Sequence, residues 1–120
     1  ALAEKENKAD IVAGLNFADH TKEVSDILLS LAQRETNNSS SEFANILSSE
    51  MSKIVKTVSN THRFAGFAVL KAPDVPSVLL ELGYLSNPDE EKLLRQEKYR
   101  KKLAKATVKA VNKFFQDPKH

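Results

Sequence analysis

Residues Val75–Leu85 read VPSVLLELGYL, an apolar run that one acidic side chain, Glu81, interrupts. A short continuous apolar run between turn residues is typical of a strand buried on both faces, as in a parallel or mixed sheet. A carboxylate buried there must be paired, bound to a metal, or altered in proton affinity, because bare burial is costly. Gly83 and the polar segment 86–91 (SNPDEE) end the strand, so Glu81 lies near its carboxyl end. Open α/β sheets bind ligands at that end, which makes Glu81 a candidate site residue.

The size and charge of the chain exclude several classes of protein. Its 120 residues suffice for one small domain, and 41% hydrophobic with 28% charged residues is ordinary for a globular protein. A net charge of +2 is too small to indicate nucleic-acid binding, and no apolar stretch is long enough to span a membrane. The absence of cysteine excludes disulfides and thiol chemistry and leaves the compartment open.

The first half of the chain has helical patterns. Residues Leu2–Val12 favour helix, and Gly14 closes the segment. Asp19 or Thr21 caps a second helix that we expect to end near Arg34. Its apolar side chains recur at spacings of three and four, and they are Val24, Ile27, Leu28 and Leu31.

The polar patch 36–41 (TNNSSS) predicts a loop between the second and third helices. Ser39 and Glu42 fit a capping box for the third helix, which we expect to end near Asn60. Its apolar stripe predicts core packing and consists of Phe43, Ile46, Leu47, Met51, Ile54, Val55 and Val58.

The second half changes period. Residues 66–70 (GFAVL) predict a short strand, and Ser77–Leu82 predicts the central strand that carries Glu81. Ser86 or Asn87 caps the next helix, with Pro88 at its first position. A break near Gln96 precedes a last helix, Lys98–Phe115, buried through Tyr99, Leu103, Ala106, Ala110 and Phe114.

About two strands and five helices predict an α/β fold with a mostly parallel central sheet flanked by helices. Two strands rarely make a self-sufficient sheet. We therefore expect the remaining strands to come from outside this chain.

The segment 66–94, GFAVLKAPDVPSVLLELGYLSNPDEEKLL, resembles the C-terminal part of the zinc-dependent N-acetylmuramoyl-L-alanine amidases, the cell-wall hydrolases of the amidase-3 family. Its most specific element is P-S-V-L-L-E-L-G-Y-L-S-N-P-x-E-E. The upstream segment 2–14, LAEKENKADIVAG, resembles the insertion of the cell-division subgroup. The resemblance implies that residues 1–120 are the C-terminal part of one catalytic domain. Residues 1–38 would form regulatory insertion helices, and 39–120 the third helix, both strands and the C-terminal helices.

The resemblance implies a catalytic role for Glu81. A zinc ion lowers the pKa of bound water, and a nearby carboxylate takes its proton during attack on an amide and hands it to the leaving amine. The implied reaction is hydrolysis of the amide between N-acetylmuramic acid and L-alanine in peptidoglycan. The implied location is the periplasm of a Gram-negative bacterium, during separation of daughter cells.

The metal ligands that the family uses are not evident here. The family holds zinc with two histidines and a glutamate from motifs like GHGG and IHA, and neither motif occurs in this sequence. The histidines present are His20, His62 and His120, and we expect none of them to be a zinc ligand. The chain by itself should therefore lack a complete zinc site.

A second implication concerns regulation. In the cell-division subgroup an inserted helix lies across the active site, and the residue matching its zinc-binding glutamate is Glu6. A glutamate in the open coordination position would hold the enzyme off until a protein activator binds the displaced state better. The candidate docking surface for that activator is the apolar stripe Val24, Ile27, Leu28 and Leu31.

Plainer interpretations remain beside these. Glu81 can be a structural carboxylate paired with Arg63 or with a lysine of the last helix, and Glu6 an ordinary exposed helix residue. The stripe from Val24 to Leu31 is by default core packing. The whole chain can also be a non-catalytic regulatory module or a helical protein-interaction module.

Overall fold

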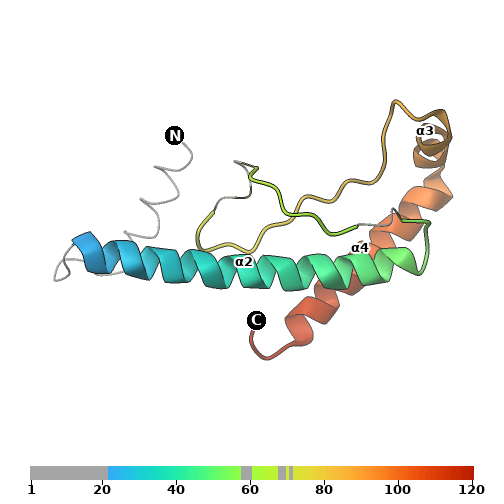
Figure 1. Ribbon diagram of the computed structural model, residues 1–120. Helices are drawn as coiled ribbons and strands as arrows, with labels where there is room; N and C mark the ends of the chain where they lie inside the picture. The colour runs from blue at the N-terminus through green and yellow to red at the C-terminus, as the bar shows by residue number, and fades with distance from the viewer. Residues whose placement is uncertain (1–21, 58–60, 68–69, 71) are drawn as a thin grey trace. The chain divides into compact units, whose positions relative to one another are not determined.

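The computed structural model describes residues 22–57, 61–67, 70 and 72–120. Three helices occur among these residues: α2 (Lys22–Ser52), α3 (Pro88–Arg95) and α4 (Glu97–Gln116) (Figure 1). None of these described helices combines the length and the apolar character that crossing a membrane requires.

The predicted α/β fold is wrong for the part of the chain that the structure describes, because it contains helices and no β-strand. Ser77–Leu82 has no ladder partner among these residues, and the side chains of Leu79 and Leu82 are 52% and 46% exposed. A strand exists only where a neighbour accepts its backbone hydrogen bonds. An apolar run indicates a preference for burial and does not supply that neighbour.

The other predicted strand, 66–70, is also wrong at the positions that the structure describes. Gly66 and Phe67 belong to no regular element, and the Leu70 N–H donates to the Phe67 carbonyl at 3.1 Å in a turn. The predicted first helix, Leu2–Val12, lies outside the described residues.

The predicted loop at 36–41 is also wrong, because α2 runs through it without interruption (Figure 1). The polar side chains there make specific contacts. Thr36 Oγ1 donates to the Pro73 carbonyl at 2.7 Å, and Ser40 Oγ accepts from the Ser77 N–H at 2.9 Å. Thr36 and Ser39 are each only 8% exposed, so this polar patch forms one side of an interior contact. α2 ends at Ser52, before the predicted end near Asn60.

The two C-terminal helices match the prediction closely. Asn87 caps α3 by accepting from the Asp89 and Glu90 N–H groups, Pro88 occupies the first turn, and Gln96 separates α3 from α4. α3 packs against α4. The buried residues of α4 are four of the five predicted, namely Leu103, Ala106, Ala110 and Phe114.

The chain divides into two compact units, one formed by residues up to Ser41 with Phe64–Val78, the other by Glu42–Arg63 with Leu79–His120. The second unit contains the buried apolar core, in which Leu47 and Met51 of α2 join the four buried residues of α4. Phe43 and Phe114 lie with ring centroids 5.3 Å apart, and the His120 ring stacks on Phe114 at 3.9 Å.

Candidate functional site

Glu81 lies on an extended segment with its side chain exposed to solvent. The predicted burial of this carboxylate is therefore wrong in the described chain. No hydrogen bond or ion pair to Glu81 occurs among the described residues, so the structural pairing with Arg63 or with a lysine of the last helix does not form. An exposed carboxylate without an intramolecular partner is available to an external water or substrate.

The backbone just after Glu81 is held in a fixed turn. Gly83 has φ +149°, a conformation that other residues rarely adopt. The Tyr84 N–H donates to Glu90 Oε2 at 2.6 Å, and the Tyr84 carbonyl accepts from the Asn87 N–H at 3.1 Å. Both polar groups of the Tyr84 backbone are thus bound to the start of α3.

The Glu90 contact extends what the sequence predicts. Asn87 is the cap, as expected, and Glu90 is the third helical residue, where a capping-box glutamate reaches back to the cap N–H. Here the Glu90 carboxylate reaches further back, to Tyr84. The spacing Asn87-x-x-Glu90 was the available signal, although it does not specify which upstream N–H the carboxylate binds.

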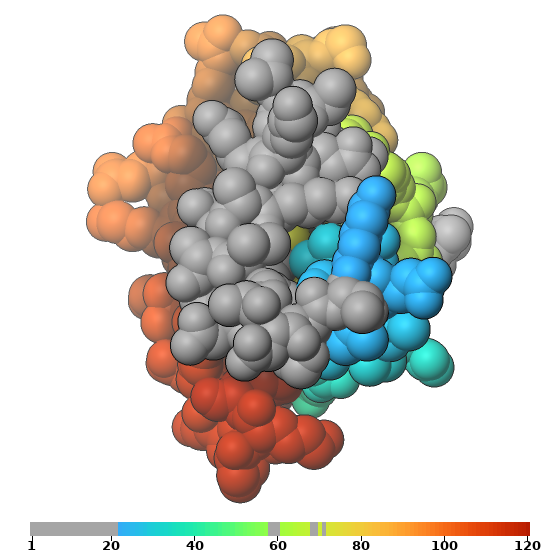
Figure 2. All heavy atoms as spheres, turned by 90° about the vertical axis from the view of Figure 1, so that its left-hand side faces the viewer, coloured from blue at the N-terminus to red at the C-terminus, as the bar shows by residue number. Residues whose placement is uncertain are grey.

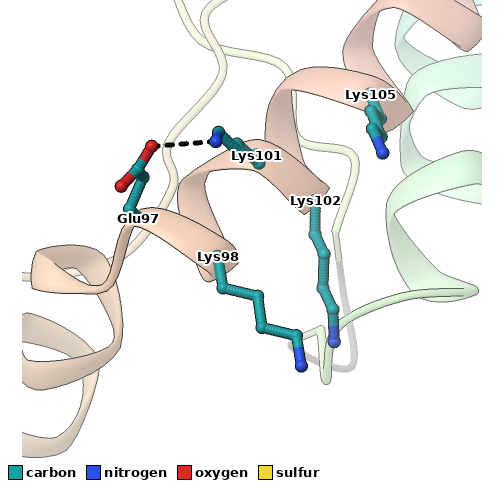
Figure 3. Close-up of a pocket in the computed structure, with 5 residues that line it drawn as sticks. All are labelled: Glu97, Lys98, Lys101, Lys102 and Lys105. Carbon is teal, nitrogen blue, oxygen red and sulfur yellow. Dashed lines mark ion pairs between the residues drawn. The ribbon is translucent and has the colours of Figure 1, made fainter.

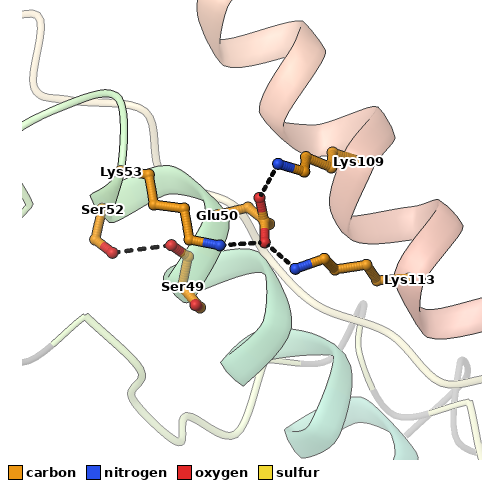
Figure 4. A network of polar contacts seen from close by, with 6 residues as sticks. All are labelled: Ser49, Glu50, Ser52, Lys53, Lys109 and Lys113. Atoms are coloured by element: carbon orange, nitrogen blue, oxygen red, sulfur yellow. Dashed lines mark hydrogen bonds and ion pairs between the residues drawn. The ribbon is translucent and has the colours of Figure 1, made fainter.

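A second carboxylate, Glu50 on α2, was not singled out from the sequence. It is 2% exposed and pairs with Lys53 at 2.6 Å, with Lys109 at 3.3 Å and with Lys113 (Figure 4). The hydrogen bonds from Lys113 and Lys53 lower the pKa of Glu50 from its ordinary 4.5 to about 2, and the Glu50 contact raises the pKa of Lys113. The ion pairs of Glu50 therefore connect α2 to α4, and the lysine partners bind both carboxylate oxygens. Its position three residues after Leu47 on the apolar stripe was the signal for its burial.

The exposed lysines of α4 line a depression of about 420 Å³ together with Glu97 (Figure 3). Lys101 pairs with Glu97 at 2.8 Å, and both side chains are about 70% exposed. Ammonium groups attract anions and do not bind metals. The lysines form a solvated helix face, and no buried side-chain polar atom lacks a hydrogen-bond partner among the described residues.

The described residues contain no candidate zinc site. No group of three or more histidine, aspartate or glutamate side chains that could hold a metal occurs among the described residues. His62 Nδ1 lies 2.9 Å from Asn45 Oδ1, and His120 Nε2 lies 3.3 Å from Glu42 Oε2. His20 and Glu6 lie outside the described residues.

The predicted partner surface is solvent-exposed. Val24 and Leu28 are each 39% exposed, Ile27 is 59% and Leu31 56%. Figure 2 shows the beginning of α2, in blue, at the surface. The default interpretation of this stripe as core packing does not hold in the described chain.

Comparison with known proteins identifies relatives along almost the whole chain. AmiA of Salmonella typhimurium, an N-acetylmuramoyl-L-alanine amidase, is 36% identical over 114 residues, which are 95% of this chain and 39% of AmiA. AmiC of Escherichia coli O6:H1 is 31% identical over 121 residues, covering 97% of this chain and 28% of AmiC. AmiC of Neisseria meningitidis is 34% identical over 114 residues, covering 95% and 27%. The chain thus spans less than half the length of these relatives.

No solved structure matches the chain. The family model described as N-acetylmuramoyl-L-alanine amidase matches residues 5–113, a range that includes Glu81 and the turn after it. The chain belongs to the N-acetylmuramoyl-L-alanine amidase family known as Amidase_3.

Proposed function

We propose that this chain is the part of a peptidoglycan amidase that supplies the proton-transferring carboxylate, Glu81. The reaction is hydrolysis of the amide between the lactyl group of N-acetylmuramic acid and L-alanine. The observation that carries the proposal is the exposed Glu81 carboxylate, which has no hydrogen-bond or ion-pair partner among the described residues and lies inside the range that matches the family. Residues 39–120 carry this function in the proposal, and residues 1–38 regulate it.

The proposed chemistry balances with one water molecule. Water attacks the lactyl carbonyl carbon, and Glu81 takes a proton from it. The carbon–nitrogen bond then breaks, and Glu81 returns the proton to the nitrogen of L-alanine. The products are the muramic acid carboxylate and a stem peptide with a free amino group. An exposed carboxylate on an anchored segment suits this exchange, because the water and the leaving nitrogen must both reach it.

Zinc dependence is part of the proposal and is supported by the resemblance of residues 66–94 to a zinc-dependent family. In this proposal a complete ligand set needs residues beyond those the structure describes, since no three described side chains form a metal-binding group. The test is metal analysis of the full-length gene product with and without a chelator. About one zinc per molecule, lost together with activity, is expected. Full activity in a metal-free protein would overturn the zinc dependence.

We further propose that the amidase is autoinhibited by the helix that carries Glu6, and that a protein activator relieves the block by docking on Val24, Ile27, Leu28 and Leu31. The exposure of those four side chains supports the docking surface. Periplasmic action in a Gram-negative cell during daughter-cell separation completes the proposal. The relatives from Salmonella, Escherichia and Neisseria, all named as N-acetylmuramoyl-L-alanine amidases, support the cell-wall substrate, and the daughter-cell role is supported by the resemblance of residues 2–14 to the cell-division subgroup. Glu6→Ala should raise the basal rate, and an unchanged rate would contradict autoinhibition.

The bond that is cleaved provides the direct test of the reaction. Purified peptidoglycan treated with the full-length protein should release stem peptides that begin with a free L-alanine amine and leave the glycan strands intact. Mass spectrometry of the soluble products distinguishes this outcome from glycan cleavage or cleavage within the stem. Release of shortened glycans would overturn the proposed bond specificity.

The alternative is a non-catalytic helical interaction module. The helical character of the described residues and the exposed apolar stripe on α2 favour it. In that case the full-length protein would bind the activator and release no stem peptide. The product analysis therefore separates the two functions.

A further inference from the structure

The Glu81 side chain makes no hydrogen bond or ion pair among the described residues that would fix its position. Its placement therefore depends on the backbone on either side. Upstream, the Ser77 N–H donates to Ser40 Oγ at 2.9 Å, four residues before Glu81. Downstream, the nearest anchored backbone group is Tyr84, three residues after Glu81.

The downstream anchor is made by the backbone of Tyr84 and not by the side chain of Tyr84 or Leu85. Tyr84 is 58% exposed and Leu85 76% exposed, so neither side chain is buried to hold the segment. The Tyr84 N–H instead donates to Glu90 Oε2, and the Tyr84 carbonyl accepts from the Asn87 N–H. A hydrogen bond from an amide to a carboxylate is stronger than one between neutral groups.

Gly83 makes the approach of Glu90 possible. A Cβ at Gly83 would lie 3.2 Å from Glu90 Oε2 and 3.5 Å from the Leu94 Cδ1 atom, and φ is +149°. A side chain there would both strain the backbone and crowd the carboxylate. Gly83 and Glu90 therefore act together in forming the turn.

We propose that Glu90 is a positioning residue for Glu81, acting through the Tyr84 backbone N–H, and that this role rests on the proposed amidase function. Glu90 is half-buried at the start of α3, a helix that packs against α4. The chain of contacts leads from α4 through α3 and Glu90 to Tyr84, and then through three residues of backbone to Glu81. The carboxylate of Glu90 transfers no proton in this account and serves only as an acceptor.

The test compares Glu90→Ala with Glu90→Gln in the full-length enzyme, using a soluble muramyl peptide as substrate. Alanine removes the acceptor, and glutamine keeps an acceptor oxygen. We expect Glu90→Ala to lower kcat roughly 10- to 100-fold with KM nearly unchanged, since small misplacement of a reacting group has effects of this size. Glu90→Gln should restore most of the rate. An equal loss in both variants would contradict the positioning role and indicate proton transfer by Glu90 itself.

Two matched variants separate positioning from general loss of structure. Glu91→Ala removes the neighbouring carboxylate, which pairs with Arg95 within α3, and should leave kcat unchanged. Gly83→Ala keeps every charge and should reproduce the loss of kcat. A loss of kcat in Glu90→Ala that equals its loss of folded protein in thermal unfolding would overturn the proposal, as would full turnover in Gly83→Ala.

A readout without substrate tests the contact in this 120-residue chain. Hydrogen exchange of the Tyr84 amide should be slow in the wild type and at least tenfold faster in Glu90→Ala, with the amides of α4 unchanged. Equal exchange rates of the Tyr84 amide in both proteins would overturn the proposed contact between Tyr84 and Glu90. Turnover retained in Glu81→Gln would overturn the proposed function, and the positioning role with it. Turnover lost in Glu81→Gln but complete in Glu90→Ala would overturn the positioning role alone.

Discussion

Lys113 of α4 donates a hydrogen bond to the carboxylate of Glu50 on α2, a contact between residues 63 positions apart in the sequence. Lys53 and Lys109 bind the same carboxylate, which is 2% exposed. The buried charge is thus compensated by three partners, whereas a carboxylate buried alone would be strongly destabilising. This cluster joins α2 to α4, the two helices whose side chains form the buried core.

The Glu50 cluster predicts a specific dependence of stability on pH. The folded pKa of Glu50, about 2, lies below its ordinary 4.5, so its stabilising contribution is present above pH 4.5 and is lost as the pH falls toward 2. Glu50→Gln should therefore lower the free energy of unfolding at pH 7, and the difference from wild type should shrink between pH 4.5 and 2. Urea unfolding across this range measures it. Glu97→Gln, which removes an exposed pair, should change stability by less than about 0.5 kcal/mol. A Glu50→Gln deficit that is constant with pH would contradict the assignment.

Adjacent phenylalanines at the end of α4 provide a matched test of the core. Phe114 is 6% exposed and contacts Phe43, whereas Phe115 is 67% exposed. Phe114→Ala should cost about 3–5 kcal/mol in the free energy of unfolding, from lost burial and the cavity it leaves. Phe115→Ala should cost far less. Urea denaturation of both variants provides the comparison, and equal losses would mean that the core is not packed around Phe114.

Two helical threonines should differ in how much their replacement by valine lowers the free energy of unfolding. Thr36 Oγ1 donates to the Pro73 carbonyl, while Thr107 Oγ1 donates to the Leu103 carbonyl within its own helix. Thr36→Val should cost about 1–3 kcal/mol, because it leaves the buried Pro73 carbonyl without its donor. Thr107→Val should be close to neutral, since the helix backbone already binds the Leu103 carbonyl. An unchanged free energy of unfolding in Thr36→Val would contradict this contact and favour the loop predicted at 36–41.

The difference at residues 36–41 has a physical origin. Thr, Asn and Ser favour turns because their side chains compete with the backbone for hydrogen bonds. Here Thr36 Oγ1 donates to the residue 73 carbonyl, and Ser40 Oγ accepts from the residue 77 N–H while it donates to the Thr36 carbonyl within α2. The helix is thus accompanied by contacts that are distant in sequence. A local pattern cannot contain that information. The caps of α3 and the buried face of α4 are local features, and these the sequence predicted correctly.

The candidate site likewise combines features that a local sequence pattern predicts with features that depend on distant residues. Glu81 was identified from its motif, but its exposure was not predicted, because burial depends on whether another strand lies beside it. Nothing in the spacing of Asn87 and Glu90 specifies Tyr84 as the partner of Glu90. The placement of Glu6 lies outside the described residues, so its role remains a prediction.

The exposed stripe on α2 predicts a separation of activation from stability. Ile27→Asp and Leu31→Asp should abolish stimulation by the activator and lower the thermal midpoint little, because both side chains are more than half exposed. Val108→Asp on α4, at a side chain that is 59% exposed, is the matched control and should leave activation intact. Activation assays and thermal melts of the same variants measure the two effects separately. A loss of stability parallel to the loss of activation would indicate that the stripe packs in a core.

The release of stem peptides by the full-length Glu81→Gln variant is the most direct measurement of the central claim. Glutamine keeps the size of the side chain and removes its ability to take and return a proton. We predict that Glu81→Gln keeps the fold and loses at least about 100-fold in the rate of release, while Glu91→Gln retains the wild-type rate. Release by Glu81→Gln at a rate near that of the wild type would contradict the account.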